Sequence, residues 1–182
     1  MRRAGGVSAA IVTPPPPRPG SLDKIKPGAL PIDAMPLAGR QMAALRENGS
    51  MSDRLTTMNS AGTFNQFVTA INSHDVKALT ALMTSDHVFV DSAGNRVYGA
   101  TSLKVGWRGY FVMCPDYWIR TDHVMAEGDA VLAVGEAGGT IDGVSWRTPA
   151  AWKAVIRDGK VVEWRVFADN KPVYEILARR QQ

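Results

Sequence analysis

The sequence has few cysteines, no long apolar run and no aromatic residue before Phe64. With Cys114 as its single cysteine, the chain cannot form an intramolecular disulfide, which is typical of a reducing compartment. No run reaches the roughly 18 apolar residues that a membrane-spanning helix needs. Residues 1–17 lack the apolar core of a cleaved signal peptide. We therefore expect a cytoplasmic protein without a membrane partner.

Motifs that bind metals are also missing. The three histidines and the lone cysteine form no HxH, HExxH or Cys/His cluster, which are the spacings that hold a metal ion. We expect no metal site and no cofactor.

The positive charge is confined to one end of the chain. The formal net charge is +4, and residues 1–50 carry seven basic and three acidic side chains. The other 132 residues carry 14 of each sign and are neutral. A neutral domain offers no electrostatic surface for phosphates, so we expect no nucleic-acid partner.

Proline is concentrated in the same N-terminal segment, where eight of the eleven prolines precede residue 50. A segment without aromatic residues buries too little apolar surface to offset its ordering entropy. We expect residues 1–55 to be a disordered extension and residues 56–182 to form one domain. Met51, followed by a polar leader, is an alternative start, so whether residues 1–50 belong to the native protein stays open.

The apolar pattern of the domain predicts helices first and strands later. Apolar residues at i, i+3, i+4 and i+7 from Phe64 predict a helix over 61–83, interrupted at 72–75. Farther along the chain, alternation of apolar and polar residues predicts strands, and Asp158-Gly159 is a strong hairpin signal. The predicted order is two helices, two strands, a helix, four strands and a closing helix. This order predicts an α+β fold, in which a strongly bent, mainly antiparallel sheet wraps around helices as a cone.

Small residues alternate along one face of the strand 131–137, namely Ala133, Gly135 and Ala137. They leave space for a pocket, but the opposite face carries Leu132, Val134 and Glu136. Which of the two faces lines the pocket stays open at this point.

Three stretches carry a family resemblance: FNQFVTAINSHDVKALTALMTSDHVFVDSAGNRVYG, VMAEGDAVLAV and RDGKVVEWRVFAD. In this order they resemble the SnoaL-like and ketosteroid-isomerase-like branch of the nuclear transport factor 2-like superfamily, over roughly residues 60–180. The resemblance implies the cone fold and a homodimer formed through the convex sheet face. It does not imply one function, because the superfamily includes isomerases, cyclases, dehydratases, hydrolases and binding domains.

Position by position, the resemblance implies that Asp91 replaces the general base of ketosteroid isomerases. The oxyanion tyrosine of that family falls on Phe67, and its protonated aspartate falls on Trp152 or, with another gap, on Ala151. Without these two donors, ketosteroid isomerisation itself is disfavoured. The epoxide-hydrolase pattern is also absent, because Val166 follows Trp164-Arg165 and the middle strand reads Gly-Glu-Ala.

Two side chains are candidates for proton transfer. Asp91 shares a strand face with Phe89 and His87, so its carboxylate would sit in the cone as a base; alternatively, it only closes the turn 91–95. His123 would share the proton transfer, or is a packed or dimer-face residue. His74 and His87 are expected at the surface or in turns.

The apolar side chains of the domain are expected to line the pocket as an aromatic wall for a small hydrophobic molecule. The expected wall residues are Phe67, Phe89, Trp107, Tyr110, Trp118, Trp146, Trp152, Trp164 and Val166. The sequence therefore predicts a small-molecule-binding protein. Proton-transfer chemistry with Asp91 as base (isomerase, cyclase or dehydratase) and a non-catalytic binding or dimerisation module both remain open.

Overall fold

Ten helices and strands follow one another in the predicted order. The computed structural model describes residues 51–179, so the extension expected over residues 1–50 lies outside the described part. The elements are α2 (Met51–Asn72), α3 (Val76–Ala81), β1 (Met83–Val90), β2 (Arg96–Tyr98), α4 (Ala100–Met113), β3 (Trp118–Glu127), β4 (Ala130–Ile141), β5 (Val144–Arg157), β6 (Lys160–Ala168) and α5 (Lys171–Arg179).

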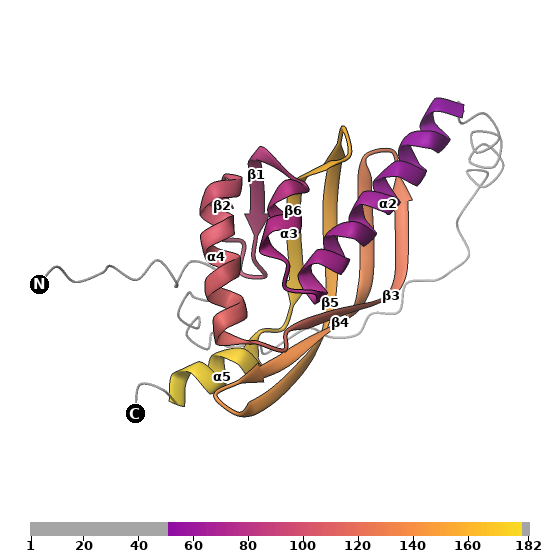
Figure 1. Cartoon of the computed structure of the whole chain (residues 1–182). Helices are drawn as coiled ribbons and strands as arrows, with labels where there is room; N and C mark the ends of the chain where they lie inside the picture. Colours follow the sequence, from indigo (N-terminus) through magenta and orange to yellow (C-terminus); the bar gives the residue numbers. More distant parts are fainter. Residues whose placement is uncertain (1–50, 180–182) are drawn as a thin grey trace, which may run out of the picture.

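The six strands form one bent sheet in the order β2-β1-β6-β5-β4-β3. Strands β1 and β6 are parallel, and every other neighbouring pair is antiparallel. Figure 1 shows α2, α3 and α4 on one side of the sheet, and α5 beside the bent end of β4 and β5. The predicted α+β fold is confirmed.

Tight Asp-Gly turns set the register of two hairpins. Asp142-Gly143 joins β4 to β5, and Asp158-Gly159 joins β5 to β6. All four residues have positive φ, between 52° and 75°. Two consecutive residues with positive φ make the type I′ turn that matches strand twist, and Asp and Gly tolerate this conformation better than other residues. The hairpin predicted at Asp158 is confirmed.

The core lies between α2 and the concave face of the sheet. Along β5, inward-facing side chains alternate with outward-facing ones and are buried from Trp146 to Ile156. The ring of Trp164 on β6 packs against Phe64 and Phe67 of α2, with centroids 5.4 and 4.8 Å apart. Each such side chain contributes about 1.5–3 kcal/mol by burial. The amphipathic stripe of α2 is therefore what holds the helix against the sheet.

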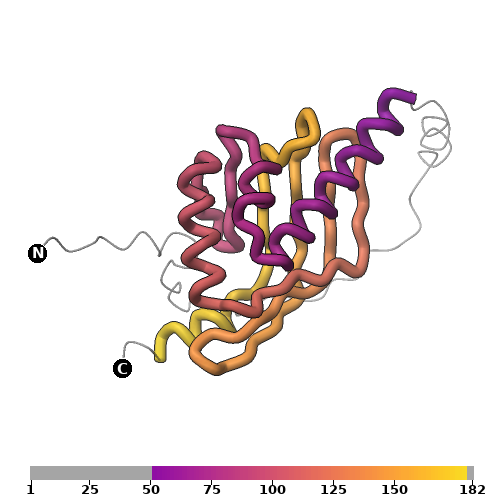
Figure 2. Tube along the Cα trace, viewed as in Figure 1, coloured from indigo at the N-terminus to yellow at the C-terminus, as the bar shows by residue number. Residues whose placement is uncertain are grey.

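Helix α2 begins at Met51, ten residues before the predicted start, so residues 51–55 are helical and not part of an extension. Figure 2 shows this first part of α2 running past the edge of the sheet. Met51, Leu55 and Met58 are exposed there, so no buried stripe marks the helix in the sequence. The Thr57 hydroxyl oxygen accepts a hydrogen bond from the Gly128 amide at 3.0 Å, which ties the helix to the β3–β4 turn.

The break between α2 and α3 lies where it was predicted. Asp75 caps α3, because its Oδ1 accepts hydrogen bonds from the amides of Lys77 and Ala78 at 3.0 and 2.9 Å. His74 has φ 53°, a conformation that reverses the chain direction. Among residues 51–179, no helix is long and apolar enough to cross a membrane.

Candidate functional site

A narrow pocket lies between α4 and the concave face of the bent sheet. Its cavity volume is about 70 Å³. The wall is formed by the ends of β1 and β6, the middle of β5 and one side of α4. The lining residues are Phe89, Asp91, Ser92, Trp107, Tyr110, Tyr117, Ala137, Trp146, Thr148, Ala150, Trp164, Val166, Ala168 and Asn170. Six of these side chains are aromatic, and only one, Asp91, is charged.

The aromatic rings meet at near right angles on one side of the pocket. Trp107 lies 6.1 Å from Tyr110 at 89° and 6.4 Å from Phe89 at 80°, measured between ring centroids and planes. Tyr110 and Tyr117 are 4.9 Å apart at 85°. Tyr117 and Trp146 are nearly parallel, at 25° and 6.1 Å. Edge-to-face contacts of this kind are favourable, so the rings hold one another in place.

Asp91 lies on the pocket wall and also closes the turn after β1. Its Oδ1 accepts hydrogen bonds from the Ala93 and Asn95 amides at 2.9 and 2.8 Å. Its Oδ2 accepts one hydrogen bond, from Asn95 Nδ2 at 2.9 Å. The residue is 7% exposed. Asp91 therefore has both of the expected placements. Its side chain closes the turn, and the residue also borders the cavity, with acceptor capacity left on one oxygen.

Polar side chains tie the segment before α5 to the pocket. Asn170 Nδ2 donates to the Ser92 hydroxyl at 2.8 Å, which connects that segment to the β1–β2 turn. The Thr148 hydroxyl donates to the Asp169 carbonyl at 2.9 Å. These bonds hold Asn170 on the pocket wall.

Burial sets the protonation of the groups beside the aromatic rings. Burial, followed by the neighbouring Tyr117 and Cys114, raises the pKa of Tyr110 well above its usual value. Burial likewise raises the pKa of Tyr117. The pKa of the Cys114 thiol rises to about 11, mainly because it is buried. At neutral pH the two tyrosines therefore offer hydroxyl groups, and Cys114 is not a nucleophilic thiolate.

The structure brings most of the predicted pocket wall together. Phe89, Trp107, Tyr110, Trp146, Trp164 and Val166 line the cavity. Three predicted wall residues lie elsewhere. Phe67 and Trp152 are 1% exposed and fill the core outside the lining. Trp118 lies against Gly138, where its ring would be 2.7 Å from an added Cβ. The interior of the cone is thus largely filled by side chains, which explains why the cavity is small.

His123, the predicted partner of Asp91, is exposed and absent from the pocket. The reason is a β-bulge between Thr121 and His123. Thr121 pairs with Gly135, but His123 pairs with Val134, whose side chain is on the exposed outer face. An added Cβ at Gly135 would collide with the Arg120 carbonyl, so β3 passes too close there for any side chain. The bulge reverses the alternation and points His123 away from Asp91.

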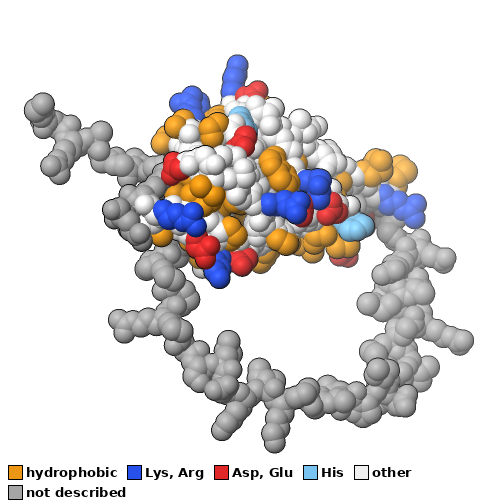
Figure 3. Space-filling model, turned by 90° about the horizontal axis from the view of Figure 1, so that it is seen from below, with side chains coloured by type: hydrophobic (Ala, Val, Ile, Leu, Met, Phe, Trp, Pro, Cys, Tyr) orange, Lys and Arg blue, Asp and Glu red, His pale blue; other side chains and the backbone are white. Residues whose placement is uncertain are grey.

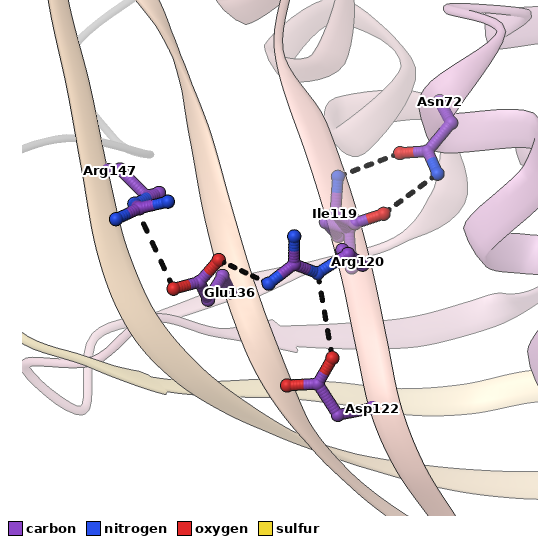
Figure 4. A network of polar contacts seen from close by, with 6 residues as sticks. All are labelled: Asn72, Ile119, Arg120, Asp122, Glu136 and Arg147. Atoms are coloured by element: carbon purple, nitrogen blue, oxygen red, sulfur yellow. Dashed lines mark hydrogen bonds and ion pairs between the residues drawn. The ribbon is translucent and has the colours of Figure 1, made fainter.

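Charged side chains surround this region of the outer face. Figure 4 shows Glu136 between two arginines: it contacts Arg120 at 2.7 Å and Arg147 at 3.8 Å. Arg120 also contacts Asp122 at 3.5 Å. In the same view, Asn72 of α2 bonds both backbone polar groups of Ile119. These arginines are engaged outside the cavity and do not supply a positive charge to it.

The sequence led us to expect His74 and His87 at the surface or in turns. His74 does lie in the turn between α2 and α3, but His87 is buried within β1. His87 is 1% exposed, and its Nδ1 lies 2.7 Å from the Val161 carbonyl, which fixes Nδ1 as the donor. Burial lowers the pKa of His87, and the Val161 bond offsets part of this effect. His74 is half-buried, stacks on Phe111 at 4.4 Å and bonds the Tyr117 carbonyl through Nε2 at 2.8 Å.

The small residues of β4 show which face of that strand is internal. Ala133 and Ala137 are buried, and Ala137 lines the pocket, whereas Leu132 and Val134 are 49% and 43% exposed. Within residues 51–179, no group of three or more His, Cys, Asp and Glu side chains is arranged to hold a metal ion.

Solved structures with the same arrangement are similar in fold. A protein from Shewanella denitrificans OS-217 assigned as a SnoaL-like polyketide cyclase has a TM-score of 0.60 at 15% identity, covering 66% of this chain and 97% of its own. An LEH-like epoxide hydrolase from M. tuberculosis has a TM-score of 0.60 at 19% identity, covering 68% and 92%. A ketosteroid isomerase-like protein from Catenulispora acidiphila DSM 44928, in complex with trimethylamine, has a TM-score of 0.54 at 18% identity, covering 58% and 83%.

At these identities the likeness shows the fold alone, which is the cone predicted from the sequence. No curated protein sequence matches the chain. The profile of the SnoaL-like domain matches residues 64–164, which is more than half of the chain and includes the rings of α4 and most of the sheet. The chain therefore belongs to the SnoaL-like domain family, within the nuclear transport factor 2-like fold.

Proposed function

We propose that this protein binds a small, largely apolar molecule in the aromatic pocket. The observation that carries the proposal is the lining itself: six aromatic side chains and a single carboxylate surround one cavity. Such a combination of apolar walls and few polar groups is typical of small-molecule sites. The cavity of about 70 Å³ limits the bound part of the ligand to a compact group.

A second candidate function is proton transfer with Asp91 as the base, in an isomerase, cyclase or dehydratase that needs no cofactor. Asp91 supports it, because the residue lines the pocket and its Oδ2 accepts a single hydrogen bond, which leaves acceptor capacity on that oxygen. The names of the Shewanella cyclase and the mycobacterial epoxide hydrolase support catalysis on this fold more generally. The burial of Phe67 and Trp152 in the core supports the alternative, a binding module without catalysis.

We also propose that the protein is a cytoplasmic homodimer, with the outer sheet face as the interface. Val134, Ala151 and Phe167 lie side by side across β4, β5 and β6 on that face, and Phe167 is 49% exposed. The surface in Figure 3 also mixes apolar, basic and acidic side chains, with no block of one sign on the face shown. Sedimentation of the wild type and of Phe167→Glu tests this: a monomeric variant supports the interface, and an unchanged mass contradicts it.

Ligand binding is tested by filling the cavity. Ala137 and Ala150 line the pocket, so leucine at either position occupies the space that a ligand needs. Ala178→Leu on the exposed side of α5 is the matched control. We expect toluene, phenol and 3,3-dimethylbutan-1-ol to raise the melting temperature of the wild type and Ala178→Leu, and not that of Ala137→Leu. A ligand at 100 times its Kd stabilises by about 2.7 kcal/mol, which is several degrees here.

Two results decide between the proposals. Equal stabilisation of the wild type and Ala137→Leu by every probe contradicts binding in this pocket. If the wild type and Asp91→Asn bind the probes equally, Asp91 is not needed for binding. Proton exchange at an acidic C–H of a bound ketone, lost in Asp91→Asn, then supports catalysis; exchange that persists contradicts Asp91 as the base.

A further inference from the structure

The charge of the pocket wall points to one class of ligand. Asp91 is the single charged side chain among the lining residues, and no lysine or arginine is among them. The nearby arginines Arg120 and Arg147 are held by Glu136 on the outer face. The Asp91 carboxylate would therefore repel an anionic ligand, and no basic side chain of the lining would offset that repulsion. A cationic ligand would be attracted to the same carboxylate.

The aromatic walls add to this preference. The π face of an aromatic ring carries negative electrostatic potential, and cations bind over tryptophan and tyrosine in particular. Three tryptophans and two tyrosines border the cavity, and Trp107 lies within 6.5 Å of Phe89, Tyr110 and Tyr117. The angles of 80–89° between neighbouring rings make corners around the cavity. The rings of Phe89, Trp107, Tyr110 and Tyr117 therefore border the cavity from different directions, and we call them the aromatic box.

Tyr117 and Trp146 are nearly parallel rings that both line the pocket, and their spacing excludes a planar ligand stacked between them. Tyr117 and Trp146 have centroids 6.1 Å apart. A ring inserted between them would need about 3.5 Å on each side, roughly 7 Å in all. A flat group therefore cannot lie between these two rings, whereas a rounded group beside them meets no such limit.

The size of the cavity fits such a group. A water molecule needs about 10–15 Å³ of cavity volume, so about 70 Å³ holds roughly five to seven water-sized groups. A quaternary ammonium head group, one nitrogen with four carbons, has this number of heavy atoms. Drug-sized ligands occupy pockets of about 300–1,000 Å³ and therefore exceed this space.

We infer that the pocket binds a methylated ammonium group, with the aromatic box around its methyl groups and Asp91 as its counter-charge. The inference rests on the proposed function, because it names the ligand class of the same pocket. Asp91 Oδ1 is occupied by two backbone amides, and Oδ2 has one hydrogen bond, so the carboxylate is held rigidly beside the cavity.

The test compares a cation with its neutral isostere. Choline and 3,3-dimethylbutan-1-ol have the same shape, with a charged nitrogen in one and a carbon in the other. Calorimetric titration of the full-length protein should give a Kd for choline about tenfold lower than that for the neutral alcohol, as expected for a desolvated cation–π site with a carboxylate. Asp91→Asn should reduce this ratio severalfold.

The contribution of the rings is tested at Tyr110, which is half-buried at the pocket. Tyr110→Phe retains the π face and should keep the preference for choline. Tyr110→Leu removes it and should weaken choline binding severalfold while leaving the neutral alcohol nearly unaffected. Circular dichroism shows which variants are folded, and the Tyr110→Phe variant, which removes only a hydroxyl, gives a result even if Tyr110→Leu does not fold.

Each outcome has one meaning. Equal affinities for the two probes, both lost in Ala137→Leu, overturn the cation inference and leave the proposed function standing. Binding of neither probe overturns the cation inference, and it overturns the proposed function as well if toluene and phenol also fail to stabilise the wild type. A tenfold preference for choline that is lost in Ala137→Leu and reduced in Asp91→Asn supports the inference.

Discussion

Substitutions of Asp91 separate its contribution to stability, through the turn after β1, from its role in the pocket. The carboxylate accepts three hydrogen bonds, two from backbone amides and one from the side chain of Asn95. Ala93 and Asn95 are exposed, so water can replace the lost acceptor. The appropriate value is therefore the net contribution of a hydrogen bond, about 1 kcal/mol, and not the larger penalty for an unsatisfied buried group.

Asp91→Ala removes all three bonds and should lower the free energy of unfolding by about 3 kcal/mol. Asp91→Asn keeps an oxygen in the Oδ1 position, and its new side-chain amide can donate to Oδ1 of Asn95 once the Asn95 side chain flips. This variant should lose about 1 kcal/mol. Asn95→Ala removes only the bond to Oδ2 and should also lose about 1 kcal/mol.

Urea denaturation followed by tryptophan fluorescence measures these differences, provided that the slope with denaturant is unchanged. The expected order of stability is wild type, then Asp91→Asn and Asn95→Ala together, then Asp91→Ala. If Asp91→Ala and Asp91→Asn agree within about 0.5 kcal/mol, the hydrogen bonds of the turn do not stabilise the fold.

Three further predictions concern the core. Phe67→Ala should cost about 3–5 kcal/mol in urea denaturation, because the ring packs on Trp164; a loss below about 1 kcal/mol would contradict its place in the core. The folded-state pKa of His87 is lowered, so its stabilising effect is present above the unfolded pKa near 6.5 and is lost as pH falls below that value toward the folded pKa. Stability should therefore drop on acidification less in His87→Gln than in the wild type, and an equal drop in the two proteins would contradict this. Cys114 should resist a thiol reagent at pH 8 until urea unfolds the protein, because its pKa is about 11 and it is buried; rapid labelling of folded protein would contradict this.

The order of the helices and strands could be predicted from the sequence, because the spacing of apolar residues changes at the same places where turn-forming residues occur. The stripe from Phe64 to Ile71 faces the core, and Asp-Gly pairs mark two hairpins. The first part of α2 could not be predicted, because its apolar residues Met51, Leu55 and Met58 are exposed and form no stripe that packs on the sheet. The start of a helix is hard to predict where the helix does not pack against the rest of the protein, because no apolar stripe is then needed there.

The site was predicted in part for similar reasons. Alternation placed Asp91 and Phe89 on one inward face, and both line the pocket. Strict alternation failed at His123, where an extra residue in β3 reverses which side chains point inward. No local feature marks this bulge except Gly135 on the opposite strand, whose missing side chain lets the two backbones approach.

The role of His87 depends on a long-range contact that no local pattern contains. Its hydrogen-bond partner is the carbonyl of Val161, 74 residues away on β6. The parallel pairing of β1 with β6 creates this contact, and a buried histidine is tolerated only with such a partner. Ser92, Thr148 and Asn170 were likewise missed as pocket residues, because Ser92 and Asn170 lie in connections between elements and Thr148 is a polar residue within a strand.

The most direct test of the binding pocket uses the five tryptophans as internal reporters. Trp107, Trp146 and Trp164 line the cavity, whereas Trp118 and Trp152 do not. In ¹H–¹⁵N spectra, with indole signals assigned by single Trp→Phe variants, titration with 3,3-dimethylbutan-1-ol or choline should shift the first three indole signals and leave those of Trp118 and Trp152 in place. Shifts confined to Trp118 and Trp152, or no shift in any of the five signals, would contradict a ligand site in this pocket.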